Sequence, residues 1–104
     1  MDKKDVLEII DRFRLNLEKQ GISVDKVLLY GSYARGNYHE GSDIDLLVVS
    51  KDFQNKDFWE RIDIIVNALM TELSPIEAYP MTPEEYENGD SMIALFAREG
   101  EEVG

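Results

Sequence analysis

The sequence predicts an α/β or α+β fold, in which a small β-sheet carries helices on one face. The first observation is periodicity. Residues 2–20 and 57–73 have apolar side chains at helical spacing, and three short apolar runs have the length of strands. The second is size, because 104 residues with 43% hydrophobic side chains suit one core. The third is the absence of cysteine, which excludes a disulfide scaffold and thiol catalysis. We therefore expect residues 1–104 to form a single domain.

The first half of the chain is predicted to fold as helix, strand, loop and strand. Residues 2–20 form the helix, and its apolar face comprises Val6, Ile9, Ile10, Phe13 and Leu17. The apolar run at residues 26–30 is predicted to be a buried strand. Residues 31–42 are rich in Gly, Ser and Asn, which favours a loop with room for one helical turn. Residues 43–50 end in β-branched side chains, which favours a second strand.

The second half is predicted to add a helix, a short strand and a helical end. The helix at residues 57–73 has an apolar stripe that comprises Phe58, Ile62, Ile65, Leu69, Met70 and Leu73. Residues 76–79 lie between two prolines, so we expect a strand at an edge of the sheet. A capping box with proline at residues 82–85 begins a further helical turn. The last helix, residues 91–98, is expected to turn Met92, Leu95 and Phe96 towards the core, and the acidic tail after Gly100 to fray.

The charge balance excludes some classes of partner. The chain has 11 Lys and Arg against 22 Asp and Glu, a net charge of −11. An excess of acids argues against binding nucleic acid through its phosphates. It fits a basic partner, or an anionic ligand that arrives with its own cations. No stretch approaches the ~18 apolar residues that span a membrane, and the start lacks the apolar run of a signal peptide. We therefore expect a cytoplasmic protein without a membrane partner.

The first candidate site feature is the pair Gly31-Ser32, directly after the first predicted strand. A glycine there lets the backbone approach a ligand closely, and N–H groups at the head of a helical turn attract phosphate. A plain turn is the alternative for this pair taken alone.

The second feature is a pair of carboxylates, Asp43 and Asp45, two residues apart on a predicted strand. Side chains alternate along a strand, so both point to one face, with Cα atoms roughly 6.5–7 Å apart. Two close anions repel unless a cation lies between them, and Mg²⁺ prefers such oxygen ligands. The alternative is a solvated start of the strand, since Asp-x-Asp arises often by chance in an acidic chain.

The third feature is Glu77, which lies between apolar residues on the third short strand. A carboxylate in such a place is unexpected, because buried Glu is rare unless it is paired or bound to metal. An exposed edge position is the alternative. Together with Gly31-Ser32 and the two aspartates, Glu77 predicts a two-metal site for phosphoryl or nucleotidyl transfer.

Two segments carry a resemblance to a known family. Residues 31–36, Gly-Ser-Tyr-Ala-Arg-Gly, are followed by residues 41–48, Gly-Ser-Asp-Ile-Asp-Leu-Leu-Val. This pattern resembles the signature of the nucleotidyltransferase superfamily related to DNA polymerase β, and in detail that of its minimal nucleotidyltransferase (MNT) group. The strong match covers residues 27–49. The third acid of the family is usually Asp, whereas Glu77 occupies that position here.

The resemblance implies a nucleotidyltransferase-like fold with a small mixed sheet, and it implies roles for the residues. Gly31 and Ser32 would hold the phosphates of a nucleoside triphosphate. Asp43 and Asp45 would bind two Mg²⁺ ions, with Mn²⁺ as a substitute, and Glu77 would complete the site and help to activate an acceptor hydroxyl. ATP would be the nucleotide donor, and AMP would be transferred to a hydroxyl of a protein. The usual partner in this group is a HEPN-domain protein, and the pair acts as a toxin–antitoxin system.

Several residues keep two interpretations at this stage. Arg35 either contacts a phosphate or steadies the loop against Asp43. Tyr33 and Tyr38 either stack on a base or cover the loop, and His39 is interpreted as a solvated loop residue. Trp59 is expected at the rim of the core. The alternative function is a binding module that neutralises its partner by contact alone, without catalysis.

Overall fold

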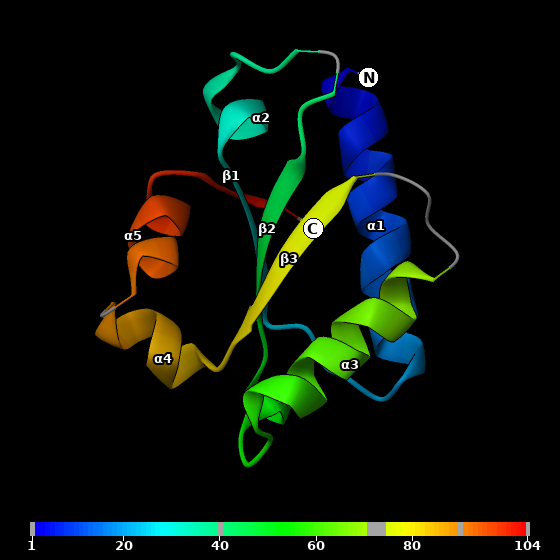
Figure 1. Ribbon diagram of the computed structural model, residues 1–104, viewed down its shortest axis with the longest axis vertical. Helices are drawn as coiled ribbons and strands as arrows, with labels where there is room; N and C mark the ends of the chain where they lie inside the picture. The colour runs from blue at the N-terminus through cyan, green and yellow to red at the C-terminus, as the bar shows by residue number, and fades with distance from the viewer. Residues whose placement is uncertain (1, 40, 71–74, 90, 104) are drawn as a thin grey trace.

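The computed structural model describes residues 2–39, 41–70, 75–89 and 91–103, and a mixed sheet lies at its centre (Figure 1). Within these ranges the sheet has four strands in the order β3-β2-β1-β4. The strands are β1 (Lys26–Tyr30), β2 (Ile44–Val49), β3 (Ile76–Met81) and β4 (Glu101–Val103). β1 is antiparallel to both β2 and β4, whereas β2 is parallel to β3. The mixed sheet and the edge position of the third strand are therefore confirmed.

Helices cover both faces of the sheet, so the prediction of helices on one face is wrong. The helices are α1 (Lys3–Lys19), α2 (Ser32–Arg35), α3 (Phe58–Leu69), α4 (Pro83–Asn88) and α5 (Met92–Arg98), with a 3₁₀ turn at Lys51–Phe53. Figure 1 shows α1 and α3 on one side of the sheet and α4 and α5 on the other. The cause is the composition of β1 and β2, which are apolar on both faces and need cover on both.

The side chains of β2 point alternately to the two faces of the sheet, and they contribute to a separate core on each face. Ile44, Leu46 and Val48 face α1 and α3 and pack with residues such as Phe13. On the opposite face Leu47 and Val49 pack with Leu28 and with α5. Since odd-numbered residues of β2 point to the α5 face, Asp45 is also directed to that face. The expected core role of the even-numbered residues is confirmed.

The apolar faces of α5 and α3 differ from the prediction. Met92, Leu95 and Phe96 were expected in the core, yet they are 65%, 51% and 51% exposed. Ala94 and Ala97 meet the sheet instead, because small side chains let a helix lie close to it. In α3, Ile65 and Ala68 are buried while Phe58 is exposed, as is Met70 at the C-cap of this helix, and Leu73 lies outside the described residues.

The tail after Gly100 does not fray, which corrects the sequence prediction. Glu101–Val103 forms β4 and pairs with Val27, Leu28 and Leu29 of β1. The pairing gives β1 a second neighbour and buries Val103, so backbone hydrogen bonds and burial together outweigh the local charge.

The predicted capping box is confirmed: Thr82 accepts from the backbone N–H of Glu85, at the start of α4. No helix in the described ranges has the length and apolar character to cross a membrane.

Candidate active site

Tyr30, Asp45 and Glu77 lie in a row across three neighbouring strands. Asp45 is the register partner of Tyr30 on β1 and of Glu77 on β3. Residues paired in register point to the same face of a sheet, so all three side chains are on the α5 face. Asp45 is half-buried, whereas Glu77 is exposed on the edge strand. The parallel pairing of β2 and β3 thus brings together two of the acids that the sequence singled out.

The bend at Gly31 lies against the Asp45 carboxylate. Gly31 has φ 75° and ψ −152°, a backbone conformation that essentially only glycine adopts. A Cβ atom at this position would overlap the carboxylate oxygen of Asp45. Glycine is therefore required twice, for the turn and for the close approach. The bend leads straight into α2, which begins at Ser32 and places Arg35 in its last turn.

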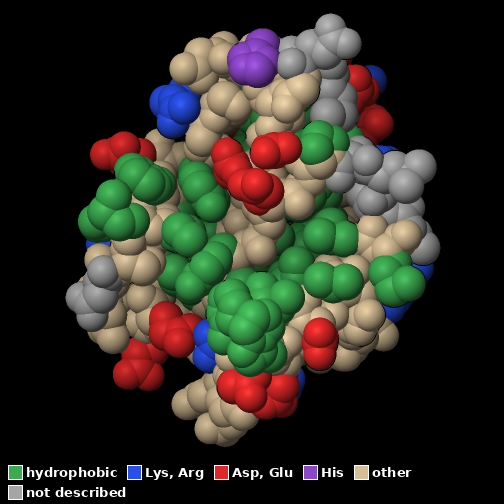
Figure 2. Space-filling view, in the orientation of Figure 1, with side chains coloured by type: hydrophobic (Ala, Val, Ile, Leu, Met, Phe, Trp, Pro, Cys, Tyr) green, Lys and Arg blue, Asp and Glu red, His purple; other side chains and the backbone are tan. Residues whose placement is uncertain are grey.

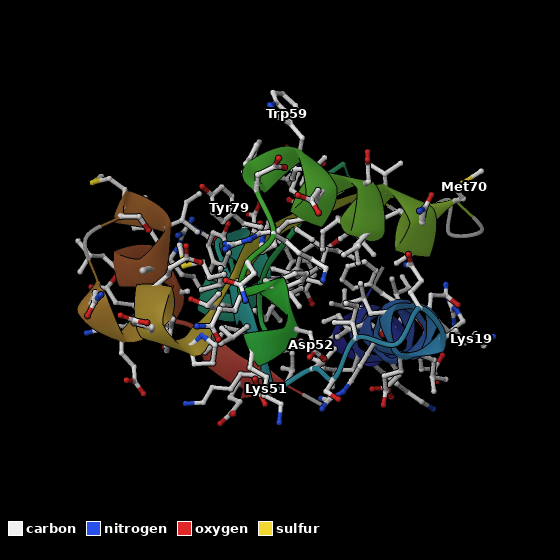
Figure 3. The ribbon with its side chains drawn as sticks, turned by 90° about the horizontal axis from the view of Figure 1, so that it is seen from below. Lys19, Lys51, Asp52, Trp59, Met70 and Tyr79 are labelled. Atoms are coloured by element: carbon white, nitrogen blue, oxygen red, sulfur yellow. The ribbon has the colours of Figure 1, made fainter. Side chains whose placement is uncertain are left out.

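Two tyrosines hold the loop that follows α2. Tyr33 is buried, and its ring stacks on Tyr38 with the centroids 4.5 Å apart. The backbone N–H of His39 donates to Oγ of Ser42 at 2.9 Å. The interpretation that the tyrosines cover the loop is the one that this packing favours. Trp59 is 72% exposed rather than at the rim of the core, and Figure 3 shows it standing away from the start of α3.

The surroundings of Asp45 raise the pKa of its carboxyl group. Burial, the contact with Glu77 and the negative charges of Glu77 and Asp43 together raise the pKa of Asp45 from 3.8 to about 6, and burial is the largest of these causes. The Arg35 guanidinium acts against these effects and lowers the pKa of Asp45. The pKa of the Tyr30 hydroxyl is raised by burial and by the charges of Asp45 and Glu77. Near neutral pH Asp45 therefore attracts a proton or a cation.

A pocket of about 400 Å³ opens at this row of side chains. Its lining comprises Tyr30, Gly31, Ala34, Arg35, Asp45, Glu77, Phe96, Glu99 and Gly100. The volume falls within the range of small-molecule sites. Four of the six predicted site residues are thus in the lining, whereas Ser32 and Asp43 are not. Figure 2 shows acidic side chains gathered near the middle of this face, with apolar side chains on both sides.

The donor chemistry of the site fits Mg²⁺. Asp45 and Glu77 offer adjacent carboxylate oxygens, and hard oxygen ligands are those that Mg²⁺ takes in proteins. Asp43 is exposed, directly ahead of β2, and close enough for its charge to act on Asp45. In the part of the chain that the structure describes, no three acidic or histidine side chains form a complete metal-binding group. The two-ion site with Asp43 stays a prediction.

Sequence reasoning missed five residues of the lining, and Tyr30, Phe96 and Gly100 among them depend on the arrangement of the fold. Tyr30 was placed in a strand, but its register with Asp45 follows only from the pairing of β1 with β2. Phe96 was assigned to the core because its helical face was misjudged, and it lines the pocket instead. Gly100 enters the pocket because β4 returns to β1. The two aromatic side chains give the pocket apolar walls.

Replacing Gly100 by alanine is expected to disturb this pocket. A Cβ atom there would overlap the backbone carbonyl of Leu29, which cannot rotate away as a side chain could. We expect a loss of about 1–3 kcal/mol in the free energy of unfolding, the usual cost of overpacking. Chemical denaturation of the parent protein and of Gly100→Ala tests this, and because Gly100 has no positive φ, the loss reports the overlap with the Leu29 carbonyl. An unchanged free energy of unfolding in Gly100→Ala would contradict the close contact.

The fold and the paired carboxylates beside a glycine bend are those of a nucleotidyl-transfer domain. The model of the nucleotidyltransferase domain family matches residues 10–96, so the chain belongs to that family. A crystal structure described as a "putative nucleotidyltransferase" from Sulfolobus solfataricus has the same fold, with a TM-score of 0.65. The alignment has 20% sequence identity and covers 79% of this chain and 71% of that one. The expected enzyme class, a nucleotidyltransferase, is confirmed at the level of the family.

Curated relatives come from Methanocaldococcus jannaschii, and each is named a "putative protein adenylyltransferase". One is 41% identical over 49 residues, which are 46% of this chain and 50% of the relative. A second is 40% identical over 57 residues, which are 54% of this chain and 39% of the relative. The chain thus spans half or less of the length of the curated relatives that it matches.

Proposed function

We propose that this protein transfers AMP from ATP to a hydroxyl group of a partner protein. The observation that carries the proposal is the pair of carboxylates at Asp45 and Glu77, partners in register on β2 and β3, set against the Gly31 bend in one pocket with Arg35. Family membership supplies nucleotidyl transfer, and the names of the curated relatives support a protein acceptor.

We assign to the residues the roles that the family resemblance implies, and the places of Gly31, Arg35, Asp45 and Glu77 in the lining of the pocket support this assignment. Gly31 and Ser32 bind the β- and γ-phosphates through the backbone at the start of α2, and Arg35 offsets phosphate charge. Asp43, Asp45 and Glu77 would hold Mg²⁺, with Mn²⁺ as a substitute. When bound, the metal neutralises the carboxylates and the phosphates and stabilises the charge that develops during transfer.

In the transfer step the acceptor hydroxyl oxygen attacks the α-phosphorus in line and forms a new phosphorus–oxygen bond. The bond from the α-phosphorus to the bridging oxygen breaks, and pyrophosphate leaves with that electron pair. The hydroxyl proton passes to a carboxylate, and Glu77 is the residue for this task because it is exposed at the edge of the pocket. Asp45, its register partner on β2, lies beside it in the same pocket.

The direct test is incubation with ATP labelled in its α-phosphate, with Mg²⁺, and with candidate acceptor proteins. We expect label on the acceptor and release of pyrophosphate, read by mass spectrometry as an AMP adduct. Label supplied in the γ-phosphate instead must not appear on the protein. Transfer of γ-label, or no ATP binding at all, would refute the proposed reaction.

For the partner, we propose a basic HEPN-domain protein in the cytoplasm, for which this chain is the antitoxin. The net charge of −11 supports a basic partner. The competing function, neutralisation by contact alone, predicts a different result for one variant. If the double variant Asp43→Asn, Asp45→Asn still neutralises the partner fully, contact suffices and modification is not the means of control.

Mg²⁺ is expected to raise the melting temperature (Tm) of the protein, and more so at about pH 7.5 than at about pH 5. At the higher pH Asp45 is ionised, since its pKa is about 6, and a bound cation relieves the repulsion among the carboxylates. At the lower pH the metal must first displace a proton. Each stabilisation of about 1 kcal/mol shifts Tm by roughly 4–8 °C in a domain of this size. Differential scanning fluorimetry measures the shift, and the same shift in Asp45→Asn would place the metal elsewhere.

A further inference from the structure

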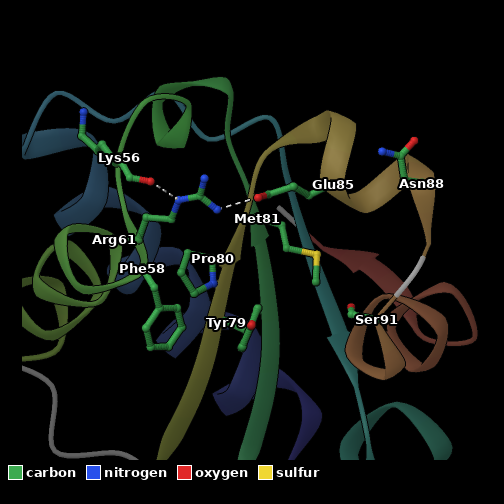
Figure 4. Close-up of a pocket in the computed structure, with 9 residues that line it drawn as sticks. All are labelled: Lys56, Phe58, Arg61, Tyr79, Pro80, Met81, Glu85, Asn88 and Ser91. Carbon is green, nitrogen blue, oxygen red and sulfur yellow. Dashed lines mark hydrogen bonds and ion pairs between the residues drawn. The ribbon is translucent and has the colours of Figure 1, made fainter.

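Three hollows follow one another along the edge strand β3. The largest, about 520 Å³, lies beside Tyr79, Pro80 and Met81 (Figure 4). A second, about 380 Å³, shares Tyr79 with it and shares Tyr30 and Glu77 with the pocket of the candidate active site. We name the second hollow the edge groove. The residues of its lining that matter here are Ile62, Val66, Ile76, Ala78, Tyr79 and Ile93. The edge groove thus leads directly to the carboxylates.

The floor of the edge groove is the outer edge of β3. Four consecutive residues, 76–79, all line it. Successive side chains of a strand point to opposite faces, so a hollow that touches all four must pass along the edge of the strand. Ile62 and Val66 of α3 form one wall and Ile93 of α5 the other. The width of the edge groove is therefore set by helices on opposite faces of the sheet.

Backbone groups on this edge have no strand beside them. Ile44 donates to the carbonyl of Pro75 and Ser50 to the carbonyl of Met81, so odd-numbered residues of β3 turn their backbone groups towards β2. Ile76 and Ala78 therefore turn their N–H and C=O groups outwards. β3 has a strand neighbour on one side only in the described sheet. Such an edge is a template for a further strand.

We propose that an extended segment of the acceptor protein adds to β3 as a further strand and so brings its hydroxyl side chain to Glu77. This inference rests on the proposed transfer of AMP to a protein. Main-chain hydrogen bonds to Ile76 and Ala78 supply affinity, and the apolar walls receive alternate side chains of the segment. The register in which the segment pairs with β3 then decides which of its hydroxyl side chains reaches the pocket.

The chemistry of the edge groove specifies an apolar segment with basic residues. Its walls are aliphatic and aromatic, while Glu77 stands at one end and Glu99 in the adjoining pocket. In the larger hollow that adjoins the edge groove at Tyr79, Arg61 is engaged by Glu85, with Nη1 to Oε1 at 2.6 Å, so its charge is already compensated (Figure 4). A second copy of the chain would bring another net charge of −11 to this edge, which disfavours self-association.

The test uses a peptide of about ten residues in which lysine alternates with valine around one central tyrosine. Hydrogen exchange read by NMR reports the backbone of β3 directly. We expect the amide protons of Ile76 and Ala78 to exchange more slowly in the complex, and the same peptide with glutamate for lysine to give no protection. Unchanged exchange at both amides with the lysine peptide would overturn the proposal.

Two matched pairs of variants separate strand addition from adhesion to an apolar surface. Ala78→Pro removes one outward N–H without breaking the ladder to β2, whereas Ala78→Ser keeps it. We expect Ala78→Pro to weaken peptide binding at least about fivefold, which corresponds to one lost hydrogen bond. Val66→Lys places a charge in the edge groove, and Leu15→Lys places it at a residue of similar exposure, 56% against 51%, outside the groove. Only Val66→Lys should repel the basic peptide.

The outcomes distinguish this inference from the proposed function. If ATP binds and AMP reaches an acceptor, but Ala78→Pro and Val66→Lys transfer it as the parent protein does, the docking surface is wrong and the reaction stands. If ATP does not bind, the reaction itself is wrong. If Ile76 and Ala78 are already protected without peptide and the protein sediments as a dimer that Val66→Lys dissociates, the occupant is a second copy, which also refutes the inference.

Discussion

Asp45→Asn is expected to reduce AMP transfer by roughly 100- to 10,000-fold, the range for loss of a group that acts in proton transfer or on developing charge. Asparagine has nearly the same shape and can still hydrogen-bond to Glu77, so the pocket should keep its form. It cannot carry the negative charge that a divalent cation needs, nor share a proton with Glu77. The loss should therefore fall on transfer rather than on folding.

The same substitution should stabilise the metal-free protein at neutral pH. The pKa of Asp45 is about 6 in the folded state against 3.8 for an unperturbed group, because of burial and its acidic neighbours. Between these values the folded protein holds a proton that the unfolded chain has released, so the free energy of unfolding falls as pH rises from about 4 to about 6. Above pH 6 the full destabilisation is present. Asparagine removes it, and we expect a gain of about 1 kcal/mol after allowance for solvent screening.

Denaturation of the parent protein and of Asp45→Asn across this pH range measures the effect. The difference in the free energy of unfolding should be small near pH 4 and should grow to a plateau above about pH 6. Asp63→Asn, at an exposed position of α3, is the matched control for the loss of one carboxylate. A variant that loses activity and stability together at neutral pH would mean that Asp45 is a structural residue.

The local sequence pattern predicted helices and strands well where a single physical cause determines the structure. The helix α1 and the strand β2 agree with their predicted bounds within a residue at each end, since periodicity and β-branching point the same way there. The edge position of β3 followed from its prolines. The faces of α5 could not be predicted, because helical spacing alone does not tell whether Ala94 and Ala97 or the larger Leu95 and Phe96 meet the sheet.

Long-range pairing explains the other errors. β4 is a short acidic segment with no local strand pattern, and it exists because β1 offers a free edge. Asp45 and Glu77 were predicted to meet, and their register places them side by side. The place of Tyr30 in the same row depends on which strand pairs with which, and that is decided by packing over the whole sheet.

Gly31→Ala is expected to have the second large effect, a loss of ATP binding by about a hundredfold or more. The φ of 75° with ψ of −152° costs a residue with a Cβ atom of the order of 1–3 kcal/mol. The added methyl group would also overlap the Asp45 carboxylate, so the bend and the carboxylate cannot both keep their positions. Strain of this size in the site corresponds to a roughly ten- to hundredfold loss of affinity for ATP, and displacement of Asp45 adds to that loss.

Gly36→Ala is the control that separates backbone strain at positive φ from steric overlap of the added Cβ with Asp45. Gly36 also has a positive φ, 81°, but an added Cβ meets no atom within 4 Å. Both variants should lose stability, since both place a side chain at positive φ. Only Gly31→Ala should also change the titration of Asp45, because only there does the methyl group touch that carboxylate. Isothermal titration with ATP and Mg²⁺, together with NMR titration of the Asp45 carboxyl carbon, gives both readouts. Equal behaviour of the two variants would mean that the bend at Gly31 serves the turn alone and that its contact with Asp45 has no part in binding.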